Sequence, residues 1–306
     1  MALPSSGVGG DHDLMTKHIT VGYDGTQSSA EAVLWAADQA ESRGAALRIV
    51  TCYSIPTTGV SMTGGFYGDA IESLESGARE IAADIATKVR TTHPDVVVNT
   101  LVEPGPAAAV LSSGLEPDDL VVVGASSHTR AAAFWLGNTP RSLVRHSPCP
   151  VAVVRGPASR GRPERVVVGV DGSPAALRAL EWAGDEADRQ RCDLVVVHGW
   201  TYPYLAVDTS SMQGRDLTQI DAACTLDRAT DHAAERFATV PTPMLVEASP
   251  PSAILETVRD GDLLVIGSRG RGSLSNAIFG STVNAVLERC AVPVVVVRDH
   301  GDESST

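Results

Sequence analysis

Short apolar runs alternate with longer amphipathic stretches along the whole chain. Runs such as Leu263–Ile266 are rich in valine, isoleucine and leucine and too short for ordinary helices, which favours strands buried on both faces. Stretches with helical periodicity separate them, so the pattern predicts a parallel sheet covered by helices on each side. The expected strands are 18–23, 47–53, 96–102, 119–123, 150–155, 165–170, 193–199, 242–247, 262–266 and 293–298. The expected helices are 28–43, 69–91, 106–114, 139–146, 174–190, 216–238, 251–259 and 282–290.

The second half of the chain repeats the first half in the same order. The matching pairs are 19–26 with 166–173, 32–36 with 179–183, 119–124 with 262–267, and 150–155 with 293–298. The offset falls only from 147 to 143, so the chain is a tandem duplication. Alternating strands and helices with right-handed crossovers predict an α/β protein made of two tandem doubly wound, five-stranded parallel-sheet domains of the Rossmann-like type.

The domain boundaries follow from the repeat. We expect a first domain at 16–155, a linker at 156–163 rich in Gly, Pro, Ser and Arg, and a second domain at 164–298. Segments 54–68 and 200–215 follow the second strand of each copy. Their Gly, Thr, Ser, Tyr and Pro content predicts mobile loops over the ligand edge of each sheet.

Charge and cysteine content exclude several classes of protein. The net charge of −13, from 24 basic and 37 acidic residues, disfavours nucleic acid as a partner. The five cysteines show no C-x-x-C spacing, so we expect reduced, buried thiols and neither a disulfide framework nor a metal site. No apolar run is long enough to span a bilayer and the N-terminus does not resemble a signal peptide, so we expect a cytoplasmic protein without a membrane partner.

A glycine-rich loop in the second copy predicts an anion site. Gly267-Ser268-Arg269-Gly270 follows a buried strand, and Gly280-Ser281 precedes a helix. Unpaired backbone N–H groups at such a helix N-terminus can hold a phosphate. We expect Gly267 and Gly270 to supply positive φ and close backbone approach, and Ser281 to supply a helix cap and a hydroxyl.

Asp171 ends the first strand of the same copy. If the strand before Asp171 lies beside the strand before Gly267, the carboxylate and the glycine loop share one crevice. A carboxylate there repels phosphate but can accept hydrogen bonds from a ribose hydroxyl or a purine amino group, or help to hold Mg²⁺. The alternative is that Asp171 is only a helix cap in Asp-Gly-Ser-Pro. His198 at a strand end is interpreted as a pocket wall rather than a catalytic base.

The first copy departs from this glycine pattern. It retains Asp24 and reads Gly124-Ala-Ser-Ser127, nine further residues and Gly137-Asn138. Ser127 replaces the second glycine, and Asn138 replaces the Ser that follows the third. Asn can cap a helix, so the loop could keep its shape. Nucleotide binding by this copy stays open.

The whole chain resembles the universal stress protein family in its tandem-domain actinobacterial form. The resemblance rests on Val168–Pro174, on Gly267-x2-Gly270-x9-Gly280-Ser281, and on Pro293–Val297. It implies a fold of the adenine nucleotide alpha hydrolase type that binds ATP with Mg²⁺. Adenosine would lie near Val170, Asp171 and His198, and the phosphates on Gly267, Ser268, Arg269, Gly270, Gly280, Ser281 and Thr282. The family role is adaptation to stress such as hypoxia, starvation or slowed growth.

These features favour a nucleotide-responsive regulator over an enzyme. We find no G-x-S-x-G and no Walker loop, so catalytic residues are not assigned, although slow ATP hydrolysis remains compatible with a phosphate cradle. The alternatives are a nucleotide-independent interaction scaffold, a weak ATPase, and a nucleotide-dependent ligase or transferase.

Partners are expected at the closing strands of the copies. Residues 150–155 and 293–298 are apolar and would each lie at a sheet edge. The resemblance implies that these two strands pack together, pairing the domains within one chain. A further homodimer and an unidentified regulatory protein partner are also expected.

Overall fold

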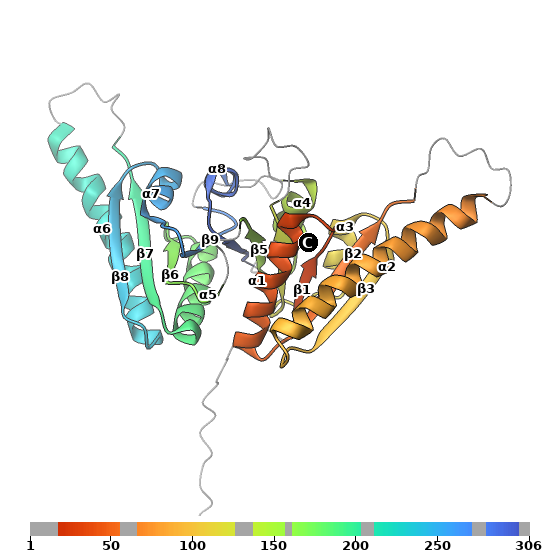
Figure 1. Cartoon of the computed structure of the whole chain (residues 1–306). Helices are drawn as coiled ribbons and strands as arrows, with labels where there is room; N and C mark the ends of the chain where they lie inside the picture. Colours follow the sequence, from red (N-terminus) through yellow and green to blue (C-terminus); the bar gives the residue numbers. More distant parts are fainter. Residues whose placement is uncertain are drawn as a thin grey trace, which may run out of the picture.

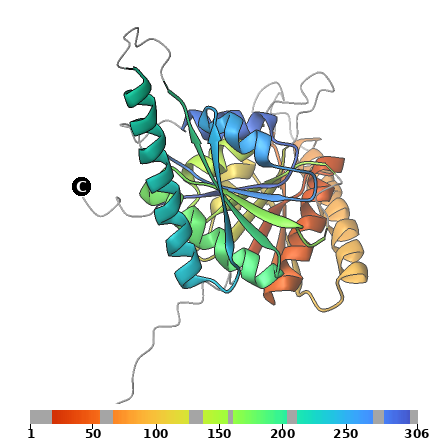
Figure 2. The same ribbon diagram turned by 90° about the vertical axis from the view of Figure 1, so that its left-hand side faces the viewer.

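The computed structural model describes residues 18–55, 66–125, 137–156, 161–202, 211–270 and 280–299. These residues form one twisted sheet with helices on both faces (Figures 1 and 2). The strands are β1 His18–Gly22, β2 Ala46–Tyr53, β3 Val98–Pro104, β4 Leu120–Gly124, β5 Val151–Val154, β6 Arg165–Gly169, β7 Asp193–Trp200, β8 Pro241–Glu247, β9 Leu263–Gly267 and β10 Val294–Val297. The helices are α1 Gln27–Arg43, α2 Phe66–Thr92, α3 Ala107–Ser112, α4 Asn138–His146, α5 Pro174–Gln190, α6 Ser211–Arg236, α7 Pro250–Thr257 and α8 Ser281–Arg289.

The strand order shows how the two domains are built and joined. It runs β3-β2-β1-β4-β5-β10-β9-β6-β7-β8, so each domain has the order 3-2-1-4-5 of a doubly wound sheet. Strands within a domain are parallel, and β5 meets β10 in an antiparallel pair that makes the two sheets continuous. The predicted α/β fold and the predicted packing of the two closing strands are both confirmed.

Two apolar layers hold the helices on the sheet. One core cluster lies under α1, α2, α5 and α6, and includes fully buried residues such as Ile19 and Leu180. The other lies on the opposite face under α3, α4, α7 and α8, and includes Leu143 and Leu287. Valine-rich strands supply both clusters, because successive side chains of a strand point to opposite faces.

The first helix of each domain begins at a well-formed cap. The hydroxyl of Ser173 accepts a hydrogen bond from the Ala176 N–H at 3.2 Å, and Pro174 occupies the first helical turn, where its missing N–H costs nothing. Thr26 caps α1 in the same way, accepting from the Ser29 N–H at 3.2 Å. These caps fix the direction in which each helix leaves the ligand edge of its sheet.

Several boundaries differ from those expected. β3 begins two residues late because Val96 packs into the core from a bend and Val97 is exposed, so the valine run is not all strand. α2 and α6 begin at Phe66 and Ser211, inside the segments 54–68 and 200–215 that were expected to be loops. Residues 56–65 and 203–210 of those segments lie outside the described residues.

Two further expectations concern the state of the cysteines and the absence of membrane-spanning helices. All five cysteines are free thiols, as predicted. Cys149 and Cys290 are buried, whereas Cys52 and Cys192 are partly buried and Cys224 is exposed on α6. The expectation that every thiol is buried is therefore wrong for these three residues. Among the described residues, no helix has the length and apolar character needed to cross a membrane.

Candidate functional site

The first-strand aspartate and the glycine loop of the second domain leave neighbouring strands. β6 pairs with β9 in parallel, with Val168 opposite Val265 and Gly169 opposite Ile266. The segments that follow these residues therefore emerge at the same edge of the sheet, where the strand order reverses. The condition on which the Asp171 prediction depended is met.

Asp171 and Gly270 are in direct contact. A Cβ atom added to Gly270 would lie 2.6 Å from Oδ2 of Asp171, so a larger residue at this point would displace the carboxylate. Oδ1 of Asp171 accepts a hydrogen bond from the Ser173 N–H at 2.9 Å. The Ser173 hydroxyl in turn donates to the Arg269 carbonyl at 3.4 Å. The carboxylate, the start of α5 and the glycine loop form one connected unit.

The helix cap of α5 is Ser173 and not Asp171. Asp171 instead stabilises the turn that leads into the helix, through its bond to the Ser173 N–H. Gly172 within that turn has φ 77, a left-handed conformation that glycine adopts without strain. The Asp-Gly dipeptide was the sequence signal for this turn, but the expectation of positive φ was assigned to other glycines.

Gly267 serves packing rather than an unusual backbone conformation. Neither Gly267 nor Gly270 has positive φ, so that part of the prediction is wrong. A Cβ atom on Gly267 would lie 2.7 Å from the carbonyl carbon of Ala175 and 2.9 Å from the Ala176 nitrogen. The strand end must be glycine because the backbone of α5 passes directly over it.

The backbone amides of the loop are not all available to a ligand. The Ser268 N–H donates to the Val297 carbonyl at 2.8 Å and extends the sheet, so it cannot also hold a phosphate. Gly280 is the N-cap of α8, and Ser281 is the first helical residue, which corrects the expected cap role of Ser281. The N–H groups of Ser281 and Thr282 lie in the first turn, where a helix offers its amides no internal partner.

A cavity of about 340 Å³ borders the Asp171 turn between α5 and α6. It is lined by Val170, Gly172, Ser173, Pro174, Ala176, Leu177, Leu180, Thr225, Arg228 and Ala229. The walls are mainly apolar, with the buried Thr225 and the exposed Arg228 as polar groups contributed by α6. Sequence reasoning missed these two residues, because no motif on α6 shows which of its faces meets α5.

His198 connects the ends of β6 and β7. Its Nδ1 lies 2.6 Å from the Val170 carbonyl oxygen. Since a carbonyl can only accept, Nδ1 carries the proton and the ring is fixed in orientation. His198 is not among the residues that line the cavity, so its interpretation as a pocket wall stays a prediction.

The first domain has the same turn but a different neighbourhood. Asp24 accepts hydrogen bonds from the Thr26 N–H at 3.0 Å and from its hydroxyl at 2.6 Å. Tyr23 stands where the second domain has Val170, and burial, with the charge of Asp24 second, raises the pKa of this tyrosine. Ile81 lies 3.5 Å from the position of a Cβ on Gly25. The residue before the aspartate is therefore larger in the first domain than in the second.

The loop residues of the first domain are only partly described. Gly124 packs like Gly267, with a Cβ position 2.7 Å from the Ser28 carbonyl oxygen. Gly137 is the N-cap of α4 and Asn138 its first residue, so Asn138 does not act as the expected cap. Ser127 lies outside the described residues.

No metal cluster accompanies the candidate site in the part of the chain that the structure describes. There, no group of three or more His, Cys, Asp or Glu side chains is arranged to hold an ion.

Comparisons with known proteins agree with the duplicated architecture. The family profile of the universal stress protein family matches residues 15–155 and again 163–298. Universal stress protein Rv2005c of Mycobacterium tuberculosis is 30% identical over 296 residues, covering 92% of this chain and 96% of the relative. Universal stress protein Rv2623 of the same organism is 31% identical over 298 residues, with the same coverage of 92% and 96%.

A solved structure shares the fold over nearly its whole length. The crystal structure of a universal stress protein from Archaeoglobus fulgidus covers 92% of this chain and 98% of its own, with a TM-score of 0.67 at 18% identity. That likeness concerns the fold alone, whereas the two profile matches span almost all of both domains. This chain belongs to the universal stress protein family.

Proposed function

We propose that this universal stress protein is an adenine-nucleotide-binding regulator and that its second domain carries the nucleotide site. The observation that supports this most strongly is the contact between Asp171 and Gly270, beside a cavity of about 340 Å³. A carboxylate, a glycine loop and an apolar cavity at one strand edge combine the groups that a nucleoside polyphosphate requires.

The charges suggest how the nucleotide would be oriented. The Asp171 carboxylate repels phosphate, so the ribose or the base would lie on its side, next to the apolar walls of Val170 and Leu180. The phosphates would lie toward the N-terminus of α8, where the amides of Ser281 and Thr282 and the helix dipole favour negative charge. Arg269 would add positive charge beside them.

The proposed cofactor is ATP with Mg²⁺. The site offers one carboxylate, Asp171, so the remaining ligands of the ion would be phosphate oxygens and water, as is usual for Mg²⁺ bound with a nucleotide. Glycine at position 270 suits this arrangement because a side chain there would displace the carboxylate.

We propose binding without efficient turnover. His198, a candidate base by residue type, is held by the Val170 carbonyl at 2.6 Å, and the chain presents no assigned group for activating water. The regulator would respond to ATP, or to the balance of ATP and ADP, during stress such as hypoxia, starvation or slowed growth. Its proposed setting is the cytoplasm, with a homodimer and a regulatory protein as partners.

The test compares matched aspartates of the two domains by titration calorimetry with Mg²⁺ and ATP. We expect the full chain to bind ATP and Asp171→Asn to weaken binding at least tenfold, because the amide loses the negative charge and half of its acceptor capacity. Asp24→Asn changes the same residue type at the matching position of the first domain. It should leave the affinity of the second domain unchanged and so serves as the control.

Three outcomes would contradict the proposal. Absence of calorimetric binding up to millimolar ATP, together with nucleotide-free purified protein, would favour the interaction scaffold. An equal loss of affinity in both aspartate variants would show that the two domains are not distinguished as proposed. Rapid Mg²⁺-dependent hydrolysis abolished by Ser281→Ala would favour the enzyme.

A further inference from the structure

The strands that join the two domains do not by themselves distinguish one domain from the other. β5 reads Val-Ala-Val-Val and β10 reads Val-Val-Val-Val, and they pair with Val295 opposite Ala152 and Val294 opposite Val153. An antiparallel pair of such similar strands would form equally well between two first domains or two second domains. Any preference for the observed pairing must come from the helices on either side.

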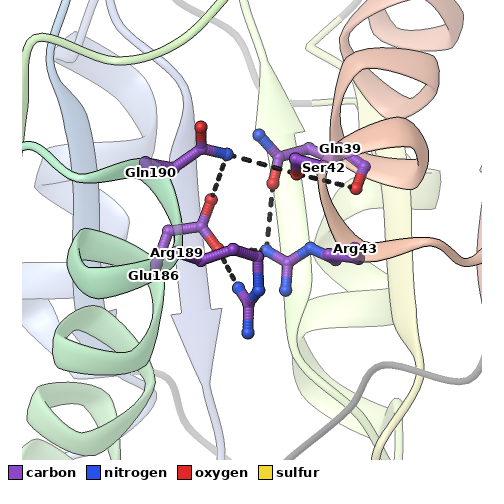
Figure 3. A network of polar contacts seen from close by, with 6 residues as sticks. All are labelled: Gln39, Ser42, Arg43, Glu186, Arg189 and Gln190. Carbon is purple, nitrogen blue, oxygen red and sulfur yellow. Dashed lines mark hydrogen bonds and ion pairs between the residues drawn. The ribbon is translucent and has the colours of Figure 1, made fainter.

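A buried ion pair joins α1 to α5. Nη2 of Arg43 lies 2.6 Å from Oε2 of Glu186, and their side chains are 3% and 0% exposed. Glu186 also accepts from Nη1 of Arg189 at 2.5 Å and from the Gln190 amide at 2.9 Å. Figure 3 shows these side chains pointing toward one another from the two helices. The guanidinium of Arg43 further stacks on the Trp182 ring, at 5.2 Å from the centroid.

The pair is costly to bury, and each member depends on the other. Burial lowers the pKa of the Arg43 guanidinium to about 10, while the Glu186 carboxylate acts in the opposite direction. Arg43 therefore stays charged at neutral pH. Removing Glu186 takes this carboxylate away from the buried Arg43 guanidinium, which is strongly destabilising even where the intact pair adds little net stability. Removing Arg43 costs less, because Glu186 keeps its ion pair with Arg189.

The internal repeat shows that the two domains differ at these positions. At the offset of 147, Glu186 corresponds to Gln39 and Gln190 corresponds to Arg43. The first domain thus presents glutamine and arginine, and the second presents glutamate and glutamine. Two first domains related in the same way would bury two arginines facing glutamine. Two second domains would bury two glutamates facing glutamine, each left with Arg189 of its own helix.

A second ion pair between the domains has the same polarity on the opposite face of the sheet. Arg141 of α4 lies 3.1 Å from Glu288 of α8, with side chains 40% and 45% exposed. At the offset of 143, Arg141 corresponds to Asn284 and Glu288 to Arg145. Here too the first domain supplies the arginine and the second the glutamate. Because this pair is exposed, it contributes far less than the buried one.

We propose that this charge polarity makes the two domains complementary to each other and not to themselves. The α1–α5 surface fits one partner, the opposite domain of this duplicated chain, and rejects a second copy of its own domain. The buried pair Arg43–Glu186 carries the selectivity, and the apolar strands β5 and β10 supply affinity without selectivity. This inference is independent of nucleotide binding.

A cleavable linker tests the proposal on the assembled protein. A protease site replaces residues 157–160 of the full chain, and native mass spectrometry after cleavage distinguishes the three possible pairings by mass. We expect the cleaved wild-type protein to remain a pair of one first and one second domain. The variant Arg43→Gln with Glu186→Gln makes these positions alike in both domains and should also yield pairs of identical domains.

The exposed pair provides the matched control. Cleaved protein with Arg141→Gln and Glu288→Gln removes the same charges from the same interface and should retain only mixed pairs. Formation of identical-domain pairs by the cleaved wild-type protein would overturn the proposal. So would exclusive mixed pairing in the variant that lacks both Arg43 and Glu186.

Unfolding of the intact chain gives a second measurement that does not depend on cleavage. Arg43→Gln and Glu186→Gln should each lower the equilibrium constant between folded and unfolded protein, measured by denaturant unfolding. The double variant should show a fall that is at least about tenfold smaller than the product of the two single falls, because the second change removes a charge whose partner across the interface is already absent. Additive single effects would overturn the claim that the buried pair acts as a unit.

Discussion

The variant Gly267→Ala tests whether this glycine is required for packing of the fold rather than for ligand binding. A Cβ at this position would lie 2.7 Å from the Ala175 carbonyl carbon and 2.8 Å from its oxygen. Carbon atoms in contact are normally about 3.5–4.0 Å apart, so the new methyl group would be roughly 1 Å too close. The opposing atoms belong to the backbone of α5 and cannot rotate away. Either α5 or the end of β9 must move.

The expected cost is at the upper end of that for overpacking a protein interior, about 3 kcal/mol. For a domain of this size, each kcal/mol lowers the unfolding midpoint by roughly 2–4 °C, which predicts a fall of roughly 6–12 °C. Circular dichroism or differential scanning calorimetry measures this fall. Gly124→Ala in the first domain is an internal replicate, because its Cβ would lie 2.7 Å from the Ser28 carbonyl oxygen.

Two other glycines of the same loop supply the contrast. The nearest atom to a Cβ on Gly280 is the Ser268 carbonyl oxygen at 4.0 Å, so Gly280→Ala should shift the midpoint by less than about 2 °C, since a single kcal/mol accounts for that much. Gly270→Ala meets only the mobile end of the Asp171 side chain, at 2.6 Å, and should lower ATP affinity more than stability. Equal midpoints for Gly267→Ala and Gly280→Ala would refute this reasoning.

Three further changes test other parts of the fold. Arg191 ends α5 in a left-handed conformation with φ 50, whereas α1 ends in the same conformation at Gly44, with φ 61. Arg191→Gly should therefore raise the free energy of unfolding in urea by roughly 0.5–1 kcal/mol, because glycine adopts this conformation without strain. A lower free energy of unfolding would contradict the idea that the Arg191 backbone is strained. Val295 is fully buried opposite Ala152, so Val295→Asp should lower the thermal midpoint and loosen the contact between domains, and unchanged unfolding would count against the strand pairing. Burial raises the pKa of Cys149 from 9.0 to about 11, so the unfolded thiol ionises first as the pH rises. Stability should therefore fall between pH 9 and pH 11 by up to about 2 kcal/mol at pH 10.5, and Cys149→Ala should remove that part of the fall.

The fold was predictable because its signals are periodic and repeated. Valine-rich runs and amphipathic stretches recur in the same order in both halves, so the assignment of each element in one half supports the matching assignment in the other. The pairing of β5 with β10 was harder to predict from the residues, because an apolar edge strand indicates a covered edge without indicating which segment covers it. The family resemblance identified the partner strand. The early starts of α2 at Phe66 and α6 at Ser211 escaped prediction because glycine, serine and threonine content is a weak guide to where a helix begins.

The candidate site was predictable only as a list of residues. Gly267, Gly270 and Gly280 look alike in the sequence, yet one is fixed by the backbone of α5, one by a carboxylate, and one faces open space. Contacts between distant segments left no local signal. Glu186 and Arg43 are 143 positions apart, and their pairing emerges only when the domains are assembled.

The two domains share most of the features on which the proposed nucleotide site depends. Gly124 and Gly267 have the same packing role, so the strand-end glycine cannot distinguish them. Asp24 and Asp171 each accept a hydrogen bond from their own turn, so the aspartate alone cannot do so either. The described difference lies in the residue that precedes each aspartate. Val170 borders a cavity of about 340 Å³, and the larger Tyr23 stands at the matching position of the first domain. If the second domain binds a nucleotide as proposed, the smaller valine favours a base beside Asp171.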